Sequence, residues 1–121
     1  MIVAGFGFRA DATIDSLENA LTATGARKIT AIAAPVDKAQ SEALQELASA
    51  LGMPVIEIPA ELMQSASTMT DSAKVREKRG TGSVAEACAL VAAGDGATLT
   101  GPRVVSKDRL ATCAIARGVR S

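Results

Sequence analysis

The chain has 121 residues, of which 48% are apolar, and its 13 basic and 13 acidic side chains leave no net charge. This length and apolar content predict a single folded domain over residues 1–121 and exclude a disordered chain. The sequence contains no His, Trp or Tyr, which argues against zinc or copper sites, Ser-His-Asp or Cys-His catalysis, and aromatic platforms for nucleic-acid bases. We therefore predict no metal, no cofactor and no nucleic-acid partner.

The first half of the chain alternates strand-like and helix-like segments. Apolar residues recur either in short continuous runs or at helical spacing, and Gly25 and Gly52 follow the two helical stretches as C-caps. Five elements are predicted in order: a strand from residue 2 that enters a glycine loop at 5–11, a helix from residue 14 to Gly25, a strand at 28–34, a helix at 39–51 and a strand at 54–59. Helices that connect successive strands predict parallel pairing.

The second half begins with a long polar segment. Residues 60–82 open with a possible short helix and then become polar, which predicts a functional or poorly ordered loop, with a mobile loop at 68–82. Ser83 and Glu86 have the spacing of a capping box before a nearly all-apolar helix. Residues 97–106 predict a strand bent at Gly101, and the short linker 107–109 predicts that a last strand at 110–116 runs antiparallel.

Together these elements predict an α/β fold. We expect three layers, α/β/α, around a mixed, mostly parallel sheet of about five strands with an antiparallel C-terminal strand. The core must consist of small and branched aliphatic groups, since Phe6 and Phe8 are the only aromatic residues. Cys88 and Cys113 lie in apolar runs and are predicted to be buried, reduced thiols. The alanine-rich helices leave a homodimer open.

The location of the protein follows from the absence of targeting signals. No cationic segment precedes an apolar one at the start, and no apolar stretch approaches the roughly 20 residues that a membrane span needs. We expect a cytoplasmic protein that does not bind membranes.

Three predicted loops should meet at the carboxyl edge of the sheet, where open α/β sheets bind ligands. The first, at 5–11, matches G-x-G-x-x-A and could hold the phosphates of a nucleotide, which is the alternative function. Against this, Asp37 lies too late for the usual ribose contact and precedes Lys38. A plain tight turn would leave the same pattern.

The loop at 78–83 is the stronger anion signal, because basic side chains and glycines precede a capped helix. Charge is also unevenly spread: residues 1–70 hold four basic and eight acidic groups, and residues 71–121 hold nine and five. Such a basic half attracts anions, although a flexible, solvated basic loop would show the same pattern.

The loop at 34–38 adds a small charged group. Lys38 and Glu42 are four residues apart, within reach of each other on one helix, and could act as a general acid and base. An ordinary surface ion pair explains the same spacing.

Five segments resemble the CobE family of cobalamin (vitamin B12) biosynthesis, which is similar to the C-terminal domain of CbiG. In chain order they are GFGFRADAT, PVDKAQSEAL, SAKVREKRGTGSVAEACAL, RVVSKD and ATCAIARG. The resemblance implies the α/β fold and a role on a corrin-ring intermediate. In CbiG-type proteins a preceding domain is present, and the whole opens a lactone on a cobalt-precorrin; this chain resembles the later domain alone. Where the family often has a cysteine, this chain has Phe8, so no thiol function carries over.

The resemblance also implies a ligand, since precorrins carry acetate and propionate arms that glycine loops, helix starts and basic groups could bind. The predicted ligand contacts are Gly5, Gly7, Arg9, Asp37, Lys38, Ser72, Arg79, Gly80, Gly82, Ser83, Glu86 and Lys107. Two roles stay open: a carrier between other corrin-pathway enzymes, or a precorrin lactone hydrolase-like enzyme that modifies a ring substituent with Lys38 and Glu42 as acid and base.

Overall fold

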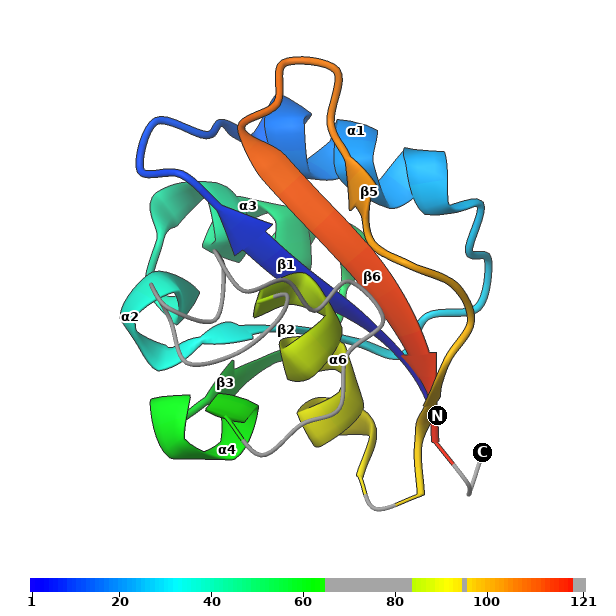
Figure 1. Cartoon of the computed structure of the whole chain (residues 1–121). Coiled ribbons are helices and arrows are strands. Elements are labelled where there is room, and N and C mark those ends of the chain that lie inside the picture. The colour runs from blue at the N-terminus through cyan, green and yellow to red at the C-terminus, as the bar shows by residue number, and fades with distance from the viewer. Residues whose placement is uncertain (65–83, 95, 119–121) are drawn as a thin grey trace.

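The computed structural model describes residues 1–64, 84–94 and 96–118 and shows the predicted three layers (Figure 1). Helices α1 and α3 cover one face of a central sheet, and α6 covers the other, with α4 packed against α6. The elements in chain order are β1 (Ile2–Phe8), α1 (Ile14–Thr24), β2 (Ala31–Pro35), α2 (Val36–Ala39), α3 (Glu42–Leu51), β3 (Val55–Ile58), α4 (Ala60–Gln64), α6 (Val84–Ala93), β4 (Thr98–Leu99), β5 (Val104–Val105) and β6 (Ala111–Arg117).

The sheet has the strand order β3-β2-β1-β6-β4, and β5 also pairs with β6. Strands β3, β2 and β1 are parallel, and β6 runs antiparallel to β1, β4 and β5, which confirms the α/β fold with an antiparallel last strand. The expected bent strand at 97–106 is divided into two strands of two residues, β4 and β5, because the chain leaves β6 around Gly101 and returns to it. Within residues 1–64, 84–94 and 96–118, the sheet therefore has six strands.

Bulky aliphatic side chains fill the face under α1 and α3, which we call the bulky face. Leu17 of α1 and Leu44 and Leu47 of α3 are buried against Phe6 and Ile32 of the sheet. Their helical spacing explains this face, and the helix ends are those predicted: Gly25 and Gly52 both adopt left-handed backbone conformations.

Glycine and alanine lie where α6 crosses the opposite face, whose core also includes Val3 and Ile58. We call it the small-residue face. A Cβ atom added to Gly5 would lie 2.2 Å from the carbonyl oxygen of Ala85 and 2.5 Å from the backbone nitrogen of Ala89. The backbone of α6 thus packs directly on β1. The predicted glycine loop is wrong in its first part, since β1 continues through Gly5 and Gly7 to Phe8 and pairs there with β6.

The predicted helix at 39–51 is also shorter than expected. A four-residue helix, α2, ends at Ala39, and α3 begins at Glu42 after the N-cap Ser41. The turn between them is closed by the backbone N–H of Ser41, which donates to the carbonyl of Lys38 at 3.0 Å, and by the Gln45 amide, which donates to the carbonyl of Ala39 at 2.6 Å.

The two thiols are buried as predicted, and neither forms a disulfide. Cys113 of β6 belongs to the bulky-face core and Cys88 of α6 to the core on the small-residue face. Burial among apolar groups raises the pKa of the Cys113 thiol well above its ordinary value. In the ranges that the structure describes, every helix is too short or too polar to cross a bilayer.

Candidate functional site

The carboxyl ends of β1, β2 and β3 meet at one edge of the sheet, where α1, α2, α3 and α4 begin (Figure 1). The turn of the β5–β6 hairpin reaches the same edge, since the backbone N–H of Arg9 donates to the carbonyl of Leu110 at 2.9 Å. This is the edge at which ligands bind in open α/β sheets.

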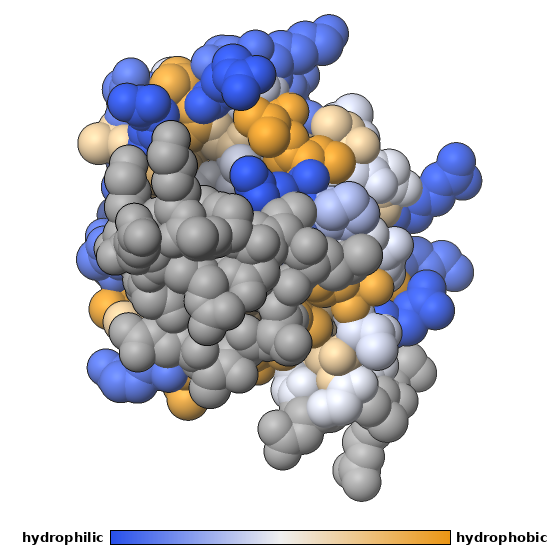
Figure 2. Space-filling model, viewed as in Figure 1, coloured by the Kyte–Doolittle hydropathy of each residue, from blue (hydrophilic) through white to orange (hydrophobic). Residues whose placement is uncertain are grey.

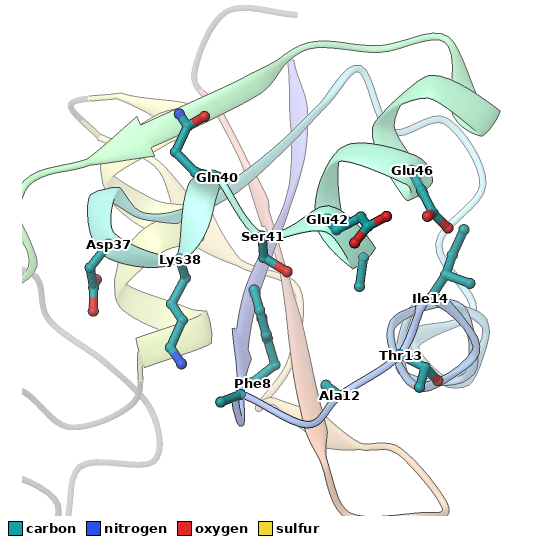
Figure 3. Close-up of a pocket in the computed structure, with 12 residues that line it drawn as sticks. Phe8, Ala12, Thr13, Ile14, Asp37, Lys38, Gln40, Ser41, Glu42 and Glu46 are labelled. Atoms are coloured by element: carbon teal, nitrogen blue, oxygen red, sulfur yellow. The ribbon is translucent and has the colours of Figure 1, made fainter.

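A pocket of about 740 Å³ lies at this edge on the bulky face, between the β1–α1 connection and the α2–α3 turn (Figure 3). We call it the edge pocket. Its volume lies within the range of about 300–1,000 Å³ that is typical of small-molecule sites. Its lining residues are Phe8, Ala10, Ala12, Thr13, Ile14, Asp37, Lys38, Gln40, Ser41, Glu42, Ala43 and Glu46.

Phe8 and Lys38 form one end of the edge pocket. Side chains alternate along β1, so Phe8 lies on the same face as the buried Phe6 but at the end of the strand. The ammonium nitrogen of Lys38 stands 5.6 Å from the centre of the Phe8 ring, a cation–π distance. This end therefore combines an apolar ring with a half-buried positive charge.

Glu42 and Glu46 form the other end, and we call them the glutamate pair. They lie one turn apart on α3 and point to the side of Ile14, while the Ser41 hydroxyl lies between them and Phe8 (Figure 3). The expected proximity of Lys38 and Glu42 on one helix is wrong, because the break at Gln40 and Ser41 places them on separate helices. Lys38 contacts Phe8 instead.

Asp108, in the turn of the β5–β6 hairpin, ties that hairpin to α1. Its two carboxylate oxygens accept from the Ser16 and Ser106 hydroxyls, each at 2.5 Å, and one accepts from the backbone N–H of Leu110 at 3.0 Å. These hydrogen bonds hold the pKa of Asp108 below its ordinary value, because they stabilise the charged form. Ser16 in turn accepts from the backbone N–H of Thr13, a pocket residue, at 3.2 Å. The hairpin thus supports the α1 wall of the edge pocket.

The hydrophilic surface around this hairpin is visible in Figure 2 at the top of the molecule. Lys107 lies in the turn of the hairpin: its backbone N–H donates to the Asn19 side chain of α1 at 2.7 Å, and it does not line the edge pocket. Arg9 lies beside the hairpin and is exposed, but it does not line the pocket either. Neither of these two predicted contacts is therefore among the lining residues of the edge pocket, although Arg9 lies between the lining residues Phe8 and Ala10.

The other predicted site residues fall into four groups. The edge pocket brings together Asp37, Lys38 and Glu42. Gly5 and Gly7 lie inside a paired strand, where they admit α6. Glu86 is fully buried, and its carboxylate accepts from the backbone N–H of Arg103 at 2.9 Å. Outside the described residues are Ser72, Arg79, Gly80, Gly82 and Ser83, and with them the expected mobile loop and capping box.

Sequence reasoning missed several pocket residues. The alternation of Phe6 and Phe8 along a strand would have placed Phe8 at the edge, and the spacing of Glu42 and Glu46 would have placed both on one side of a helix. The S-x-D pattern at Ser106 and Asp108 is typical of a side-chain-stabilised turn.

The comparisons with known proteins agree in naming cobalamin biosynthesis. A family model described as "Cobalamin synthesis G C-terminus" matches residues 2–116. The structure is similar to that of CobE, a protein from the cobalamin (vitamin B12) biosynthetic pathway, with 27% identity, a TM-score of 0.86, and 98% of this chain and 94% of that one covered.

Two further structures are similar. One is the cobalamin biosynthesis protein chiG from Agrobacterium tumefaciens str. C58, with 31% identity, a TM-score of 0.76, and 98% and 99% of the two chains covered. The other is a cobalamin biosynthesis protein G homolog from Sulfolobus solfataricus, with 18% identity and a TM-score of 0.69, which supports the fold alone; 95% of this chain covers 36% of that one. None of the curated protein sequences matches the chain.

Proposed function

The chain belongs to the cobalamin synthesis G C-terminus family and is a protein of cobalamin biosynthesis, and we propose that it binds a polycarboxylate precorrin in the edge pocket. The observation that carries this proposal is the position of Lys38 over the Phe8 ring. A precorrin presents a broad apolar ring with acidic arms on its rim. Phe8 offers apolar contact to such a ring, and Lys38 offers a charge to one arm.

Between the two roles left open by the sequence, the geometry favours the carrier. An acid–base pair must reach the same reacting group, within about 3 Å or through one water. Lys38 and Glu42 stand on separate helices and face different ends of the edge pocket (Figure 3). We propose that the protein holds an intermediate for other enzymes of the pathway.

Binding is tested by titrating the protein with hydrogenobyrinic acid and following the visible absorption band of the macrocycle. We expect a saturable shift, and we expect Lys38→Gln to weaken binding about fivefold, as the loss of one partly exposed ion pair would. Lys28→Gln is the matched control, because Lys28 is exposed and lies outside the edge pocket. Equal affinity of both variants would refute the site, and the absence of any shift would refute the ligand.

The carrier role is tested by mass spectrometry. The protein is incubated with a lactone-bearing precorrin, and the pigment is then released and its molecular mass is measured. Recovery of the unchanged pigment is expected for a carrier. A pigment that has gained one water molecule, at a rate that depends on Lys38 or Glu42, would establish a hydrolase instead.

A further inference from the structure

The charges of the edge pocket are distributed unevenly between its two ends. One end has the half-buried ammonium group of Lys38 over Phe8, and the exposed carboxylate of Asp37 lies beside it on α2, so the two charges of this end balance (Figure 3). The other end has the two carboxylates of the glutamate pair, next to the side chain of Ile14 (Figure 3). The pocket is thus uneven along its length: its positive charge lies at the α2 end, where Asp37 balances it, and its net negative charge lies at the α3 end. Neither the net charge of the chain nor its basic second half indicates this.

The fold fixes this uneven distribution of charge. Glu42 and Glu46 lie one turn apart on a helix whose opposite side is anchored by the buried Leu44 and Leu47, so both carboxylates remain on the pocket side. Lys38 is kept at the other end by the turn that separates α2 from α3. In the part of the chain that the structure describes, no group of three His, Cys, Asp or Glu side chains could hold a metal ion. Both side chains of the glutamate pair are exposed and line the pocket, so a ligand at this end meets two carboxylates.

A polycarboxylate ligand meets different forces at the two ends, because only the end at α2 offers it a positive group. An acidic arm is attracted to Lys38, whereas the same arm next to the glutamate pair is repelled. An arm that ends in an amide is not repelled there, and its N–H groups can donate to the carboxylates.

We propose that Glu42 and Glu46 determine specificity in the edge pocket: they orient a corrin-type ligand so that its acidic arms lie toward Lys38 and an uncharged, hydrogen-bond-donating arm lies toward α3. This inference rests on the proposed function and narrows its ligand class. It also gives Glu42 a role in selection in place of the acid–base role that the sequence suggests.

The test compares two ligands on three proteins. The ligands are hydrogenobyrinic acid, whose arms end in carboxylates, and a derivative of the same ring whose arms are primary amides. The proteins are the wild type, the double variant Glu42→Gln/Glu46→Gln, and Glu18→Gln. Glu18 is the matched control, because it is an exposed glutamate on α1 outside the pocket lining. Circular dichroism and a thermal melt establish that each variant is folded.

The double variant is expected to bind hydrogenobyrinic acid about fivefold more tightly than the wild type in about 50 mM salt, and the gain should largely vanish near 0.5 M salt, roughly where exposed charges are screened. Its affinity for the amidated derivative should stay equal or fall, and Glu18→Gln should change neither affinity by more than about 1.5-fold.

An unchanged or weakened affinity of the double variant for hydrogenobyrinic acid would overturn the inference and leave the proposed function standing. If the wild type bound neither ligand, the proposed function would fall and the inference with it.

Discussion

The two faces of the sheet are packed by opposite means. On the bulky face, branched side chains such as Leu17, Leu44 and Ile32 fill the space between the sheet and two helices. On the small-residue face, glycine and alanine let the backbone of α6 approach β1 so closely that no Cβ fits at Gly5. The bulky face is stabilised by large buried side chains. The small-residue face instead requires that Gly5 has no side chain, so that the backbone of α6 can pack on β1.

This difference also explains where the edge pocket lies. Helices held away from the sheet by large side chains leave space between them where the side chains end. Ile14 and Phe8 stand at that end, so the gap between α1 and α3 opens as a pocket there. Asymmetric packing thus accounts for the position of the edge pocket.

The largest expected effect breaks the small-residue face. Gly5→Ala places a methyl group against the backbone of Ala85 and Ala89, which cannot rotate away, and should lower the free energy of unfolding by more than about 3 kcal/mol. Gly7→Ala is the control on the same strand. Its nearest neighbours are the Thr112 hydroxyl at 3.0 Å and the Val84 side chain, which can adjust, so the change should stay within about 1 kcal/mol. Urea denaturation measures both, and equal values would contradict the direct backbone contact.

The next effect concerns the bulky face. Leu44→Ala removes a fully buried side chain and should lower the free energy of unfolding by about 3 kcal/mol, through lost burial and a cavity. Leu62→Ala on α4 removes the same atoms from a position that is 47% exposed, and should cost less than about 1 kcal/mol. Calorimetry of the two variants sharpens the comparison. Similar melting temperatures would show that buried side-chain volume does not stabilise the packing of the bulky face.

A smaller effect tests whether volume alone secures the bulky face, since Asp108 ties the hairpin to α1 there. Its pKa is lower in the folded protein than its ordinary value of 3.8, so its stabilising effect is complete well above that pH and is lost as the pH falls through the folded-state pKa. Asp108→Asn should therefore be less stable than the wild type near pH 7, and the difference should shrink below about pH 4. Urea denaturation from neutral to acid pH measures it. A difference that stays constant down to acid pH would assign the effect to shape instead of charge.

The smallest effect lies in the hairpin turn outside either face. Arg109 has a φ of 64°, in the left-handed region that favours glycine. Arg109→Gly should raise the free energy of unfolding by about 0.5 kcal/mol, since relief of strain is partly offset by greater chain entropy in the unfolded state. Arg109→Ala removes the same charge and keeps the strain, so thermal melts of the two variants should differ. Equal melting temperatures of the two variants would show that the left-handed backbone angle of Arg109 does not destabilise the folded protein.

The sequence was sufficient to predict the elements and their order where local chemistry decides. Helices ended by Gly25 and Gly52 and the antiparallel hairpin at 107–109 all appear as expected. The role of Gly5 was harder to predict, because a glycine at this position could serve either a tight turn or the close approach of another backbone segment. Only the partner element decides between them, and α6 lies 80 residues further along the chain.

The edge pocket was predicted in part. Its location at the carboxyl edge, Asp37, Lys38 and Glu42 followed from the sequence, whereas the contact of Lys38 with Phe8 did not. The periodicity of residues 39–51 continues through the break at Ser41, so the pattern alone cannot reveal that Lys38 turns away from Glu42. Such a break depends on tertiary packing.

The two buried thiols allow the opening of the two faces of the sheet to be measured separately. Cys88 lies in the core under α6 and Cys113 in the core under α1 and α3, so each face carries its own reporter without any substitution. A thiol reagent can react only when the surrounding layer separates from the sheet. The rates at which the two cysteines are labelled would therefore give the opening frequency of each layer, and their ratio would show which side of the native protein opens first.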